Sequence, residues 1–295
     1  MSREAPSGMD SAARRISTPI GLTLVRSSEI YGAEPYFHEL TAGLDRIVRP
    51  YGHSVLLRVL PSRQAELQCY REWWAAKAVA AVVLVDLTEE DARVALVNEL
   101  GIPAISVSSP DLSSGLSAVW TNDDEAMETA VEGLTRLGHE RLAHVSGPRG
   151  LAHSVARRDT FLTICKERDI EAWTAAGDYS LESGERALRV LMDADKANGP
   201  TAIIFDNDLM ALGGLAEAER SGHQVPRDLS LIAWDDSAQC QLSEPPLSAL
   251  SHDVQRIGEM VGETVLAVLE GQSPPTLEAP PIIFVPRGTT GVARS

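Results

Sequence analysis

Cysteine is scarce in this sequence: the three cysteines among 295 residues, Cys69, Cys165 and Cys240, lie far apart. A disulfide framework uses an even number of cysteines, and a structural zinc site uses closely spaced ones. Neither pattern is present. We therefore expect a protein of a reduced, cytoplasmic compartment that has no structural metal site.

Long apolar runs are also missing. The longest one, AVAAVVLV at residues 78–85, is far too short to span a bilayer. The first residues, MSREAPSGMDSAARRIS, carry charge but lack the apolar core of a secretory signal peptide. The sequence thus predicts no association with a membrane.

Positive charge is in deficit. The formal net charge of −16 predicts a surface that repels the phosphates of nucleic acids. Only residues 1–18, which are rich in Ser, Ala and Arg, depart from this balance, and we expect them to form a flexible linker.

Motifs of catalysis are absent from the sequence. It contains no G-x-S-x-G, H-E-x-x-H, P-loop or G-x-G-x-x-G, and its seven histidines are dispersed. The Asp-Asn-Asp stretch at 206–208 lacks the spacing and the glycine of a calcium loop. We expect no enzyme, assign no catalytic residue, and predict neither a cofactor nor a metal site.

What the sequence does contain is a regular series of short apolar runs. They lie at 20–25, 54–60, 78–87, 103–107, 141–147, 201–205, 229–234 and 281–285. Little alternation within these runs is typical of parallel strands that are buried on both faces. Amphipathic stretches of helical length separate most of them, and three of these stretches, 36–52, 125–138 and 208–222, end at a glycine.

This alternation of strands and helices predicts an α/β fold of doubly wound parallel sheets. Eight strands over this length fit two smaller sheets, in two lobes, better than one sheet. An eight-fold barrel is disfavoured because residues 234–253 read as a long loop with a short extended piece, not as a helix.

Polar side chains follow the apolar runs, where parallel sheets bind ligands. They include Asp86 after the third run, Asn207 after the sixth and Asp235 after the seventh. Such groups, with serines and aromatic residues, predict a pocket for a small hydroxylated ligand. Structural roles stay open: Asp208 as a helix cap, and Asp206 as a solvated strand end.

A structural role is equally open for several of the polar and aromatic side chains at this edge. Asp235 and Asp236 are compatible with an ordinary turn, and Arg157 with a solvated helix face. Tyr36 and Phe37 could pack beneath a loop rather than face a ligand.

Several segments together resemble the effector-binding core of the lactose repressor (LacI/GalR) family. They are LTRLGHERLAHVSGP (134–148), ARRDTF (156–161), PTAIIFDNDLMALGGLAEAERSGHQVPRDLSLIAWDD (200–236), PPLSAL (245–250) and VPRGTT (285–290). The resemblance spans Ile20 to Thr290 and implies two lobes of the periplasmic binding protein type I kind, joined by three crossover strands. It also implies a homodimeric transcriptional regulator whose small-molecule effector, a carbohydrate or related metabolite, modulates DNA binding. A transport-associated sugar-binding protein is the alternative.

The resemblance also assigns roles to individual residues. Arg157 and Asp235 stand at effector-binding positions, Asn207 faces the effector while Asn207-Asp208 caps a helix, and aromatic residues cover the ligand. The effector-binding set is Ser27, Tyr36, Asp86, Ser108, Asn122, Arg157, Tyr179, Asn207 and Asp235. We expect Arg157 and Asp235 on facing sides of one cleft, with Asn207 between them.

This chain also departs from the family pattern. Asn122-Asp123 stands where Asp-Asn is usual, and Ser108 stands where an aspartate is often found. Thr160 replaces a glycine, and Ala233-Trp234 replaces a glycine followed by Phe or Tyr. Only 19 residues precede the first strand, so we expect a helix-turn-helix headpiece to be absent from this chain. Operator DNA is expected to be bound only through such a headpiece.

The same resemblance predicts how the chain is divided. Residues 1–18 form a hinge remnant, 19–121 with 251–278 the first lobe, and 122–250 with 279–293 the second. Helices at 36–51 and 64–76 form the dimer interface of the first lobe, with Trp73 and Trp74 as candidate anchors.

Overall fold

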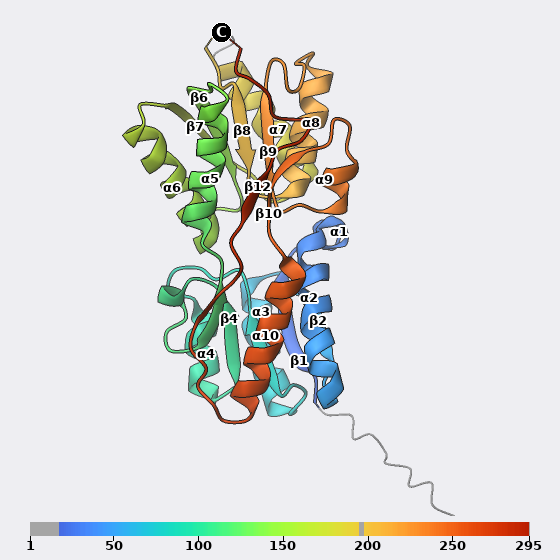
Figure 1. Cartoon of the computed structure of the whole chain (residues 1–295). Coiled ribbons are helices and arrows are strands. Elements are labelled where there is room, and N and C mark those ends of the chain that lie inside the picture. The colour runs from blue at the N-terminus through green and yellow to red at the C-terminus, as the bar shows by residue number, and fades with distance from the viewer. Residues whose placement is uncertain (1–17, 195–197, 295) are drawn as a thin grey trace, which may run out of the picture.

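The computed structural model describes residues 18–194 and 198–294, which form two α/β lobes stacked end to end (Figure 1). Each lobe is built on one six-stranded sheet. The expected linker, residues 1–18, lies outside the described residues except for Thr18.

The first sheet has the strand order β11-β5-β4-β3-β1-β2, and all its neighbours are parallel. Its strands are β1 (Ile20–Val25), β2 (Val55–Leu60), β3 (Ala81–Leu84), β4 (Ala104–Val107), β5 (Ser117–Trp120) and β11 (Leu277–Glu278). The helical elements of this lobe are α1 (Ser28–Ala33), α2 (Pro35–Val48), η1 (Arg49–Tyr51), α3 (Arg63–Ala75), α4 (Ala92–Leu100), η2 (Pro110–Leu112) and α10 (Val254–Leu269).

The second sheet has the order β12-β10-β9-β8-β6-β7, and only its edge strand β12 runs antiparallel to its neighbour. Its strands are β6 (Arg141–Ser146), β7 (Glu171–Ala176), β8 (Ala202–Phe205), β9 (Ser230–Trp234), β10 (Ser248–Ser251) and β12 (Ile283–Val285). Its helices are α5 (Asp123–Arg136), α6 (Ala152–Glu167), α7 (Leu181–Ala194), α8 (Asp208–Arg220) and α9 (Ala238–Leu242).

The chain passes between the two lobes three times. The passages lie between β5 and α5, between β10 and α10, and between β11 and β12 (Figure 1). The prediction of two mostly parallel α/β lobes is confirmed, and the barrel is excluded. The residue at which each lobe begins stays a prediction.

Each apolar run expected to be a strand contains one. The expectation that these strands are buried on both faces is wrong for β2 and β12, because they lie at sheet edges and are only partly buried. Gly52, Gly138 and Gly222 all have positive φ, as expected of residues that follow a helix. The expectation that 234–253 contains no helix is wrong, because α9 forms there. Strand β7 was not expected, since it lies at a sheet edge and is only partly buried.

Within the described ranges, no helix has both the length and the apolar character required to cross a bilayer. Trp73 is 6% exposed and packs in the core of the first lobe, where its ring lies against Gly21. The expectation that Trp73 anchors a dimer interface is therefore wrong, because its ring is already buried by its own sheet. Trp74 is only partly buried.

The helices α2 and α10 of the first lobe approach each other through glycines. A Cβ on Gly43 would lie 2.1 Å from the carbonyl oxygen of Gln255, and one on Gly258 would lie 2.1 Å from that of Leu40. Real Cβ contacts are never that short, so the two backbones can meet only where no side chain intervenes. This contact joins α10, which comes late in the chain, to the beginning of the first lobe.

We predict that Gly43→Ala lowers the free energy of unfolding by about 2 kcal/mol or more, because the added methyl must push the two helices apart. The control is Gly32→Ala in α1, where a Cβ would meet no atom within 4 Å. Alanine there should be neutral or stabilising by up to about 1 kcal/mol. Urea denaturation measures both, and equal stability of the two variants would contradict the close approach.

Candidate functional site

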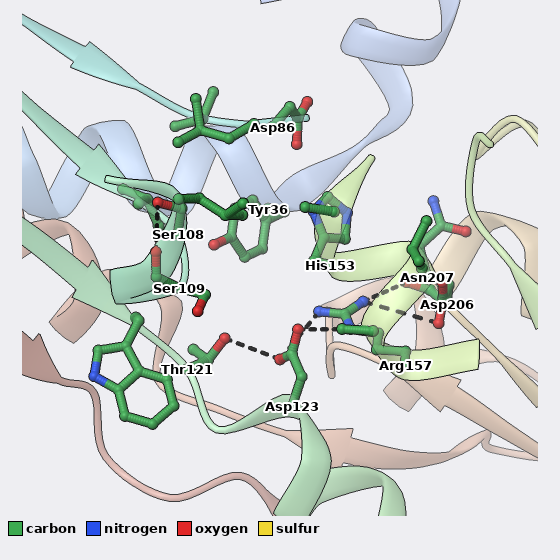
Figure 2. A pocket seen from close by; sticks show the side chains of 18 of the residues that line it. Tyr36, Asp86, Ser108, Ser109, Thr121, Asp123, His153, Arg157, Asp206 and Asn207 are labelled. Carbon is green, nitrogen blue, oxygen red and sulfur yellow. Dashed lines mark hydrogen bonds and ion pairs between the residues drawn. The ribbon is translucent and has the colours of Figure 1, made fainter. Parts of the chain in front are cut away.

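A cavity of about 410 Å³ lies between the two lobes. Its walls come from the carboxyl ends of strands in both sheets and from the segments that follow them, the position where parallel α/β sheets bind ligands. Figure 2 shows Tyr36, Asp86 and Ser108 on one side and Asp123, Arg157 and Asn207 on the other.

The structure brings together eight of the nine residues that were predicted from the sequence to bind the effector. The eight that line the cavity are Tyr36, Asp86, Ser108, Asn122, Arg157, Tyr179, Asn207 and Asp235. Ser27 does not line it; its hydroxyl accepts a hydrogen bond from the backbone N–H of Ile30 and caps α1. A serine directly before a helix serves this role more often than ligand binding.

Arg157 is held by three groups of the second lobe. Its Nε donates to Asp123 Oδ2 at 3.0 Å, and its Nη1 donates to the carbonyl oxygen of Asp206 at 3.4 Å (Figure 2). Its guanidinium lies 3.9 Å from the centroid of the Trp234 ring, a close cation–π contact. The alternative of a solvated arginine is therefore wrong, since Arg157 is 9% exposed.

Asp206 is part of the same wall and is buried, not solvated. One carboxylate oxygen lies 2.8 Å from His144 Nε2, and the other accepts the backbone N–H of Gly147 at 2.8 Å. Burial acts to raise the pKa of Asp206, but His144 and Arg157 outweigh it, so that the pKa is lowered. Asp206 thus supplies a negative charge behind Arg157.

Asn207, not Asp208, caps helix α8. Its Oδ1 accepts the backbone N–H of Met210 at 2.9 Å, and its Nδ2 donates to the carbonyl oxygen of Tyr179 at 3.1 Å. Asp208 instead accepts bonds from Ser237 N and Cys240 Sγ. The expected capping role of Asp208 is wrong, because its side chain turns toward the loop after β9.

Sequence reasoning missed Arg26 and Glu34 as site residues. Arg26, at the end of β1, forms an ion pair with Asp86 at 2.7 Å and a hydrogen bond with Glu34 at 3.3 Å. Its guanidinium also lies 5.2 Å from the ring centroid of Tyr179, a residue of the other lobe. Its position directly after the first apolar run was the available signal.

The guanidinium of Arg26 therefore pairs with two carboxyl groups, and the pKa values of these two groups shift in opposite directions. Burial acts to raise the pKa of Asp86, but Arg26, His153 and Arg93 together lower it. For Glu34, burial prevails over the effect of Arg26 and raises the pKa to about 7. Asp86 thus carries the charge that balances Arg26, while Glu34 is half protonated near neutral pH.

The backbone of Asp86 is fixed by a buried network beneath the cavity. Asp86 has a φ of 53°, and its carbonyl oxygen accepts bonds from Arg93 Nη2 at 2.9 Å and Arg63 Nη2 at 3.1 Å. Both arginines also pair with Glu66, which is fully buried. One buried ion pair, Arg93–Glu66, and one partly exposed pair, Arg63–Glu66, thus orient the backbone that presents the Asp86 carboxylate to the cavity.

Tyr179 has less surface free for a ligand than expected. It is 4% exposed, and its hydroxyl bonds to His153 Nε2 at 2.6 Å and Ser154 Oγ at 3.0 Å. The imidazole of His153 stacks on its ring, with centroids 6.3 Å apart. Tyr36 lines the cavity, whereas Phe37 is 2% exposed and belongs mainly to the core.

Asn122 and Asp123, at the start of α5, bond to different partners. Asn122 Oδ1 accepts the backbone N–H of Glu125 and caps the helix, while Asp123 faces Arg157. Ser108 donates to Ser106 Oγ at 3.0 Å. Capping turns the Asn122 side chain back toward its own helix, so its neighbour became the partner of the arginine.

Asp235 lies at the passage between the lobes. Its φ is 74°, and its Oδ1 lies 2.6 Å from Nε2 of His252, which precedes α10. Asp236 instead forms an ion pair with Arg287 at 2.7 Å. Asp235 is thus more than a turn residue, because it contacts a segment that joins the two lobes.

Over the described ranges, no three His, Cys, Asp or Glu side chains are grouped so that they could hold a metal ion. The carboxylates of the cavity instead face arginines, histidines and backbone N–H groups. The arrangement is suited to hydrogen bonding with an organic ligand.

The raised pKa of Glu34 predicts a pH-dependent stability. The unfolded carboxyl releases its proton near 4.5 and the folded one near 7, so its contribution is complete below pH 4.5 and is lost as the pH rises to 7. In wild type this loss is on the order of 3 kcal/mol. Relative to wild type, Glu34→Gln should therefore gain stability over this window.

Urea denaturation at pH 4.5, 6 and 8 measures this change. Burial and the charge of Asp235 also raise the pKa of Asp208 to about 7. Asp208 therefore keeps part of the pH dependence of stability in the Glu34→Gln variant. The matched control is Glu132→Gln, which removes an exposed carboxyl from α5. An unchanged difference between Glu34→Gln and wild type at all three pH values would contradict a raised pKa.

Comparison with known proteins identifies the family. Residues 131–290 match the family described as a periplasmic binding protein-like domain. The regulator CelR of Thermobifida fusca is 25% identical over 266 residues, which cover 88% of this chain and 77% of CelR. A solved structure of a CelR–cellobiose complex shares the fold at 23% identity, with a TM-score of 0.84 over 93% of this chain and 85% of that one.

A LacI family transcriptional regulator from Bifidobacterium animalis subsp. lactis is more similar still. Its crystal structure is 32% identical, covers 94% of this chain and 98% of its own, and superposes with a TM-score of 0.85. The chain therefore belongs to the LacI family of transcriptional regulators, with a periplasmic binding protein-like fold.

Proposed function

We propose that this chain is the sensing part of a transcriptional regulator that binds a small hydroxylated ligand between its lobes. The observation that carries the proposal is the 410 Å³ cavity, whose walls come from both lobes. A ligand that contacts both walls favours one arrangement of the lobes over another. Such a ligand changes DNA affinity through a coupling free energy.

A carbohydrate is the ligand class that we propose. The cavity presents carboxylates, an amide and hydroxyls, which bond to sugar hydroxyls, beside the rings of Tyr36 and Trp120, which can cover C–H faces. The CelR complex with cellobiose, a similarly folded regulator, supports this class and supplies the first probe.

The site residues stay a proposal as well. We propose that Asp235, Arg157 and Asn207 contact the ligand from the second lobe, and that Tyr36, Asp86 and Ser108 contact it from the first. Asn122 and Tyr179 line the same cavity. Ser27 is not included, since its hydroxyl is used as a helix cap.

DNA binding stays a prediction from the sequence. The net charge of −16 opposes binding to phosphates, so tight binding to an operator requires a dedicated basic element. The expectation that a headpiece is absent falls outside the described residues. The alternative of a transport protein is disfavoured because CelR and the Bifidobacterium protein are transcriptional regulators.

We predict that a neutral saccharide raises the melting temperature. A ligand at 100 times its dissociation constant adds about 2.7 kcal/mol to the free energy of unfolding. A thermal-shift screen of cellobiose, other mono- and disaccharides, polyols and nucleosides measures it. A screen in which only nucleosides bind would contradict the proposed class.

Asp235→Asn should then weaken binding of the saccharide about 10- to 100-fold, because a bond between a charged group and a ligand is worth roughly 1.5–3 kcal/mol. Asparagine tolerates the positive φ of this position, so that the fold is retained. The control is Asp236→Asn, whose carboxylate pairs with Arg287 and does not line the cavity. Calorimetry that finds equal affinity for wild type and Asp235→Asn would remove Asp235 from the site.

We further propose a homodimer formed through α2 and α3, with Trp74 in place of Trp73 as the aromatic contact. Tyr51, at the end of η1, and Leu56, on the edge strand β2, add exposed apolar surface to this side of the lobe. Sedimentation velocity at micromolar concentration should show a dimer of the 31.8 kDa chain. A monomer under these conditions would contradict the proposal.

A further inference from the structure

The charge of the cavity wall is dominated by carboxyl groups. Eight of the residues that line it are acidic, and the cationic ones are Arg26 and Arg157, with no lysine among the described lining residues. A ligand that enters therefore meets an excess of negative charge.

Arg26 is already neutralised within the wall. It lies 2.7 Å from Asp86 and 3.3 Å from Glu34, both of which line the cavity, and its flat face is covered by Phe37 and Tyr179. An anionic ligand could bind this guanidinium only by displacing a buried carboxylate, which would then lose its partner.

Arg157 is neutralised in the same way. Asp123 lies 3.0 Å from its Nε, Asp206 lies 3.9 Å from its Nη1, and Trp234 covers its face. The two helices that begin beside these carboxylates are also closed to anions, because Asn122 and Asn207 cap them. The start of α6 also lines the cavity and has no side-chain cap; there the backbone N–H of Ala152 donates to the carbonyl oxygen of Leu87. Both guanidinium groups, which usually bind phosphate or carboxylate, are thus in use.

The rim of the cavity adds more negative charge. Glu89 and Asp111 of the first lobe and Asp124 of the second are exposed acidic residues that line the cavity. Inside, His252 is engaged with Asp235 and His153 with Tyr179. Burial and the charge of Arg157 lower the pKa of His153, which leaves it neutral at physiological pH.

We propose that this cavity selects its ligand by charge: it accepts uncharged or amino-bearing polyhydroxyl molecules and rejects those that carry a carboxylate or phosphate group. The inference rests on the proposed function, because it concerns the same cavity. Neutral hydroxyls can bond to carboxylates that keep their arginine partners. An anion would be repelled by the carboxylates and would find no free cation among the described lining residues. The cavity would thus gain specificity by excluding anions.

The first test compares sugars that differ only in charge. Glucose, glucosamine and glucuronate form one set, and galactose, galactosamine and galacturonate form a second. Thermal shift at matched ionic strength and calorimetry should give the acidic member of each set at least tenfold weaker binding than its neutral parent. An acidic member that binds more tightly than its parent would overturn the proposal.

The second test needs no knowledge of the ligand and uses inorganic phosphate. Phosphate should not raise the melting temperature of wild type above that in chloride of equal ionic strength. In the double variant Asp86→Asn, Glu34→Gln, Arg26 loses both partners, and phosphate should now stabilise the protein in a concentration-dependent way. Asparagine suits the positive φ at position 86, and glutamine matches the shape of glutamate.

The matched control is Asp45→Asn, Glu132→Gln, which releases Arg49 and Arg136 on the surface, away from the cavity. Stabilisation of wild type or of this control by phosphate as large as that of the cavity variant would overturn the proposal. So would a folded cavity variant that does not respond. If circular dichroism shows that the double variant does not fold, Asp86→Asn alone replaces it, and phosphate should stabilise it less than the double variant would be stabilised, because Glu34 still lies beside Arg26.

The two tests separate this inference from the proposed function. If no sugar binds while phosphate behaves as expected, charge selection is supported and carbohydrate sensing fails. If glucuronate or galacturonate binds wild type better than its neutral parent, carbohydrate sensing is supported and charge selection fails.

Discussion

The cavity between the lobes depends on two arginines that each share two carboxylates. Arg26 holds Asp86 and Glu34 in the first lobe, and Arg157 holds Asp123 and Asp206 in the second. Removing Arg26 would leave Asp86 and Glu34 without their partner in a poorly solvated place, which costs several kcal/mol. Removing Arg157 would leave Asp123 without its arginine, whereas Asp206 would keep His144 and the backbone N–H of Gly147. The wall of the cavity is therefore a set of interlocked ion pairs whose geometry is settled before a ligand arrives.

The same residues link the two lobes to each other. The guanidinium of Arg26 lies 5.2 Å from the Tyr179 ring centroid, and the backbone N–H of Ala152 in the second lobe donates to the carbonyl oxygen of Leu87 in the first. Separation of the lobes would break these contacts, and with them the apolar packing of Ile30 of α1 against the core of the second lobe. A ligand that bonds to both walls shifts the balance between the two arrangements of the lobes by its differential affinity for them.

The sequence predicted the sheets well and the pairing of side chains poorly, for a physical reason. A strand buried on both faces, such as Ile20–Val25, must be apolar throughout, whereas the edge strand Glu171–Ala176 keeps an exposed face and lacks that signal. The end of a strand placed Asp235 at the cavity, and the family resemblance placed Arg157 there. They could not show that Asp123 rather than its neighbour would pair with Arg157, 34 residues further along the chain, because that depends on how two helices pack.

The glycine contact between α2 and α10 has a consequence for synthesis on the ribosome. All strands from β6 to β10 belong to the second sheet, so that lobe can form its core from nearly continuous chain, while α2 of the first lobe waits for α10 to emerge. At ordinary elongation rates this interval is on the order of 10 s. Until α10 is made, the side of α2 that carries Leu40, Leu44 and Val48 lacks the cover that α10 provides, so the first lobe exposes apolar surface until late in synthesis although most of its strands are made early.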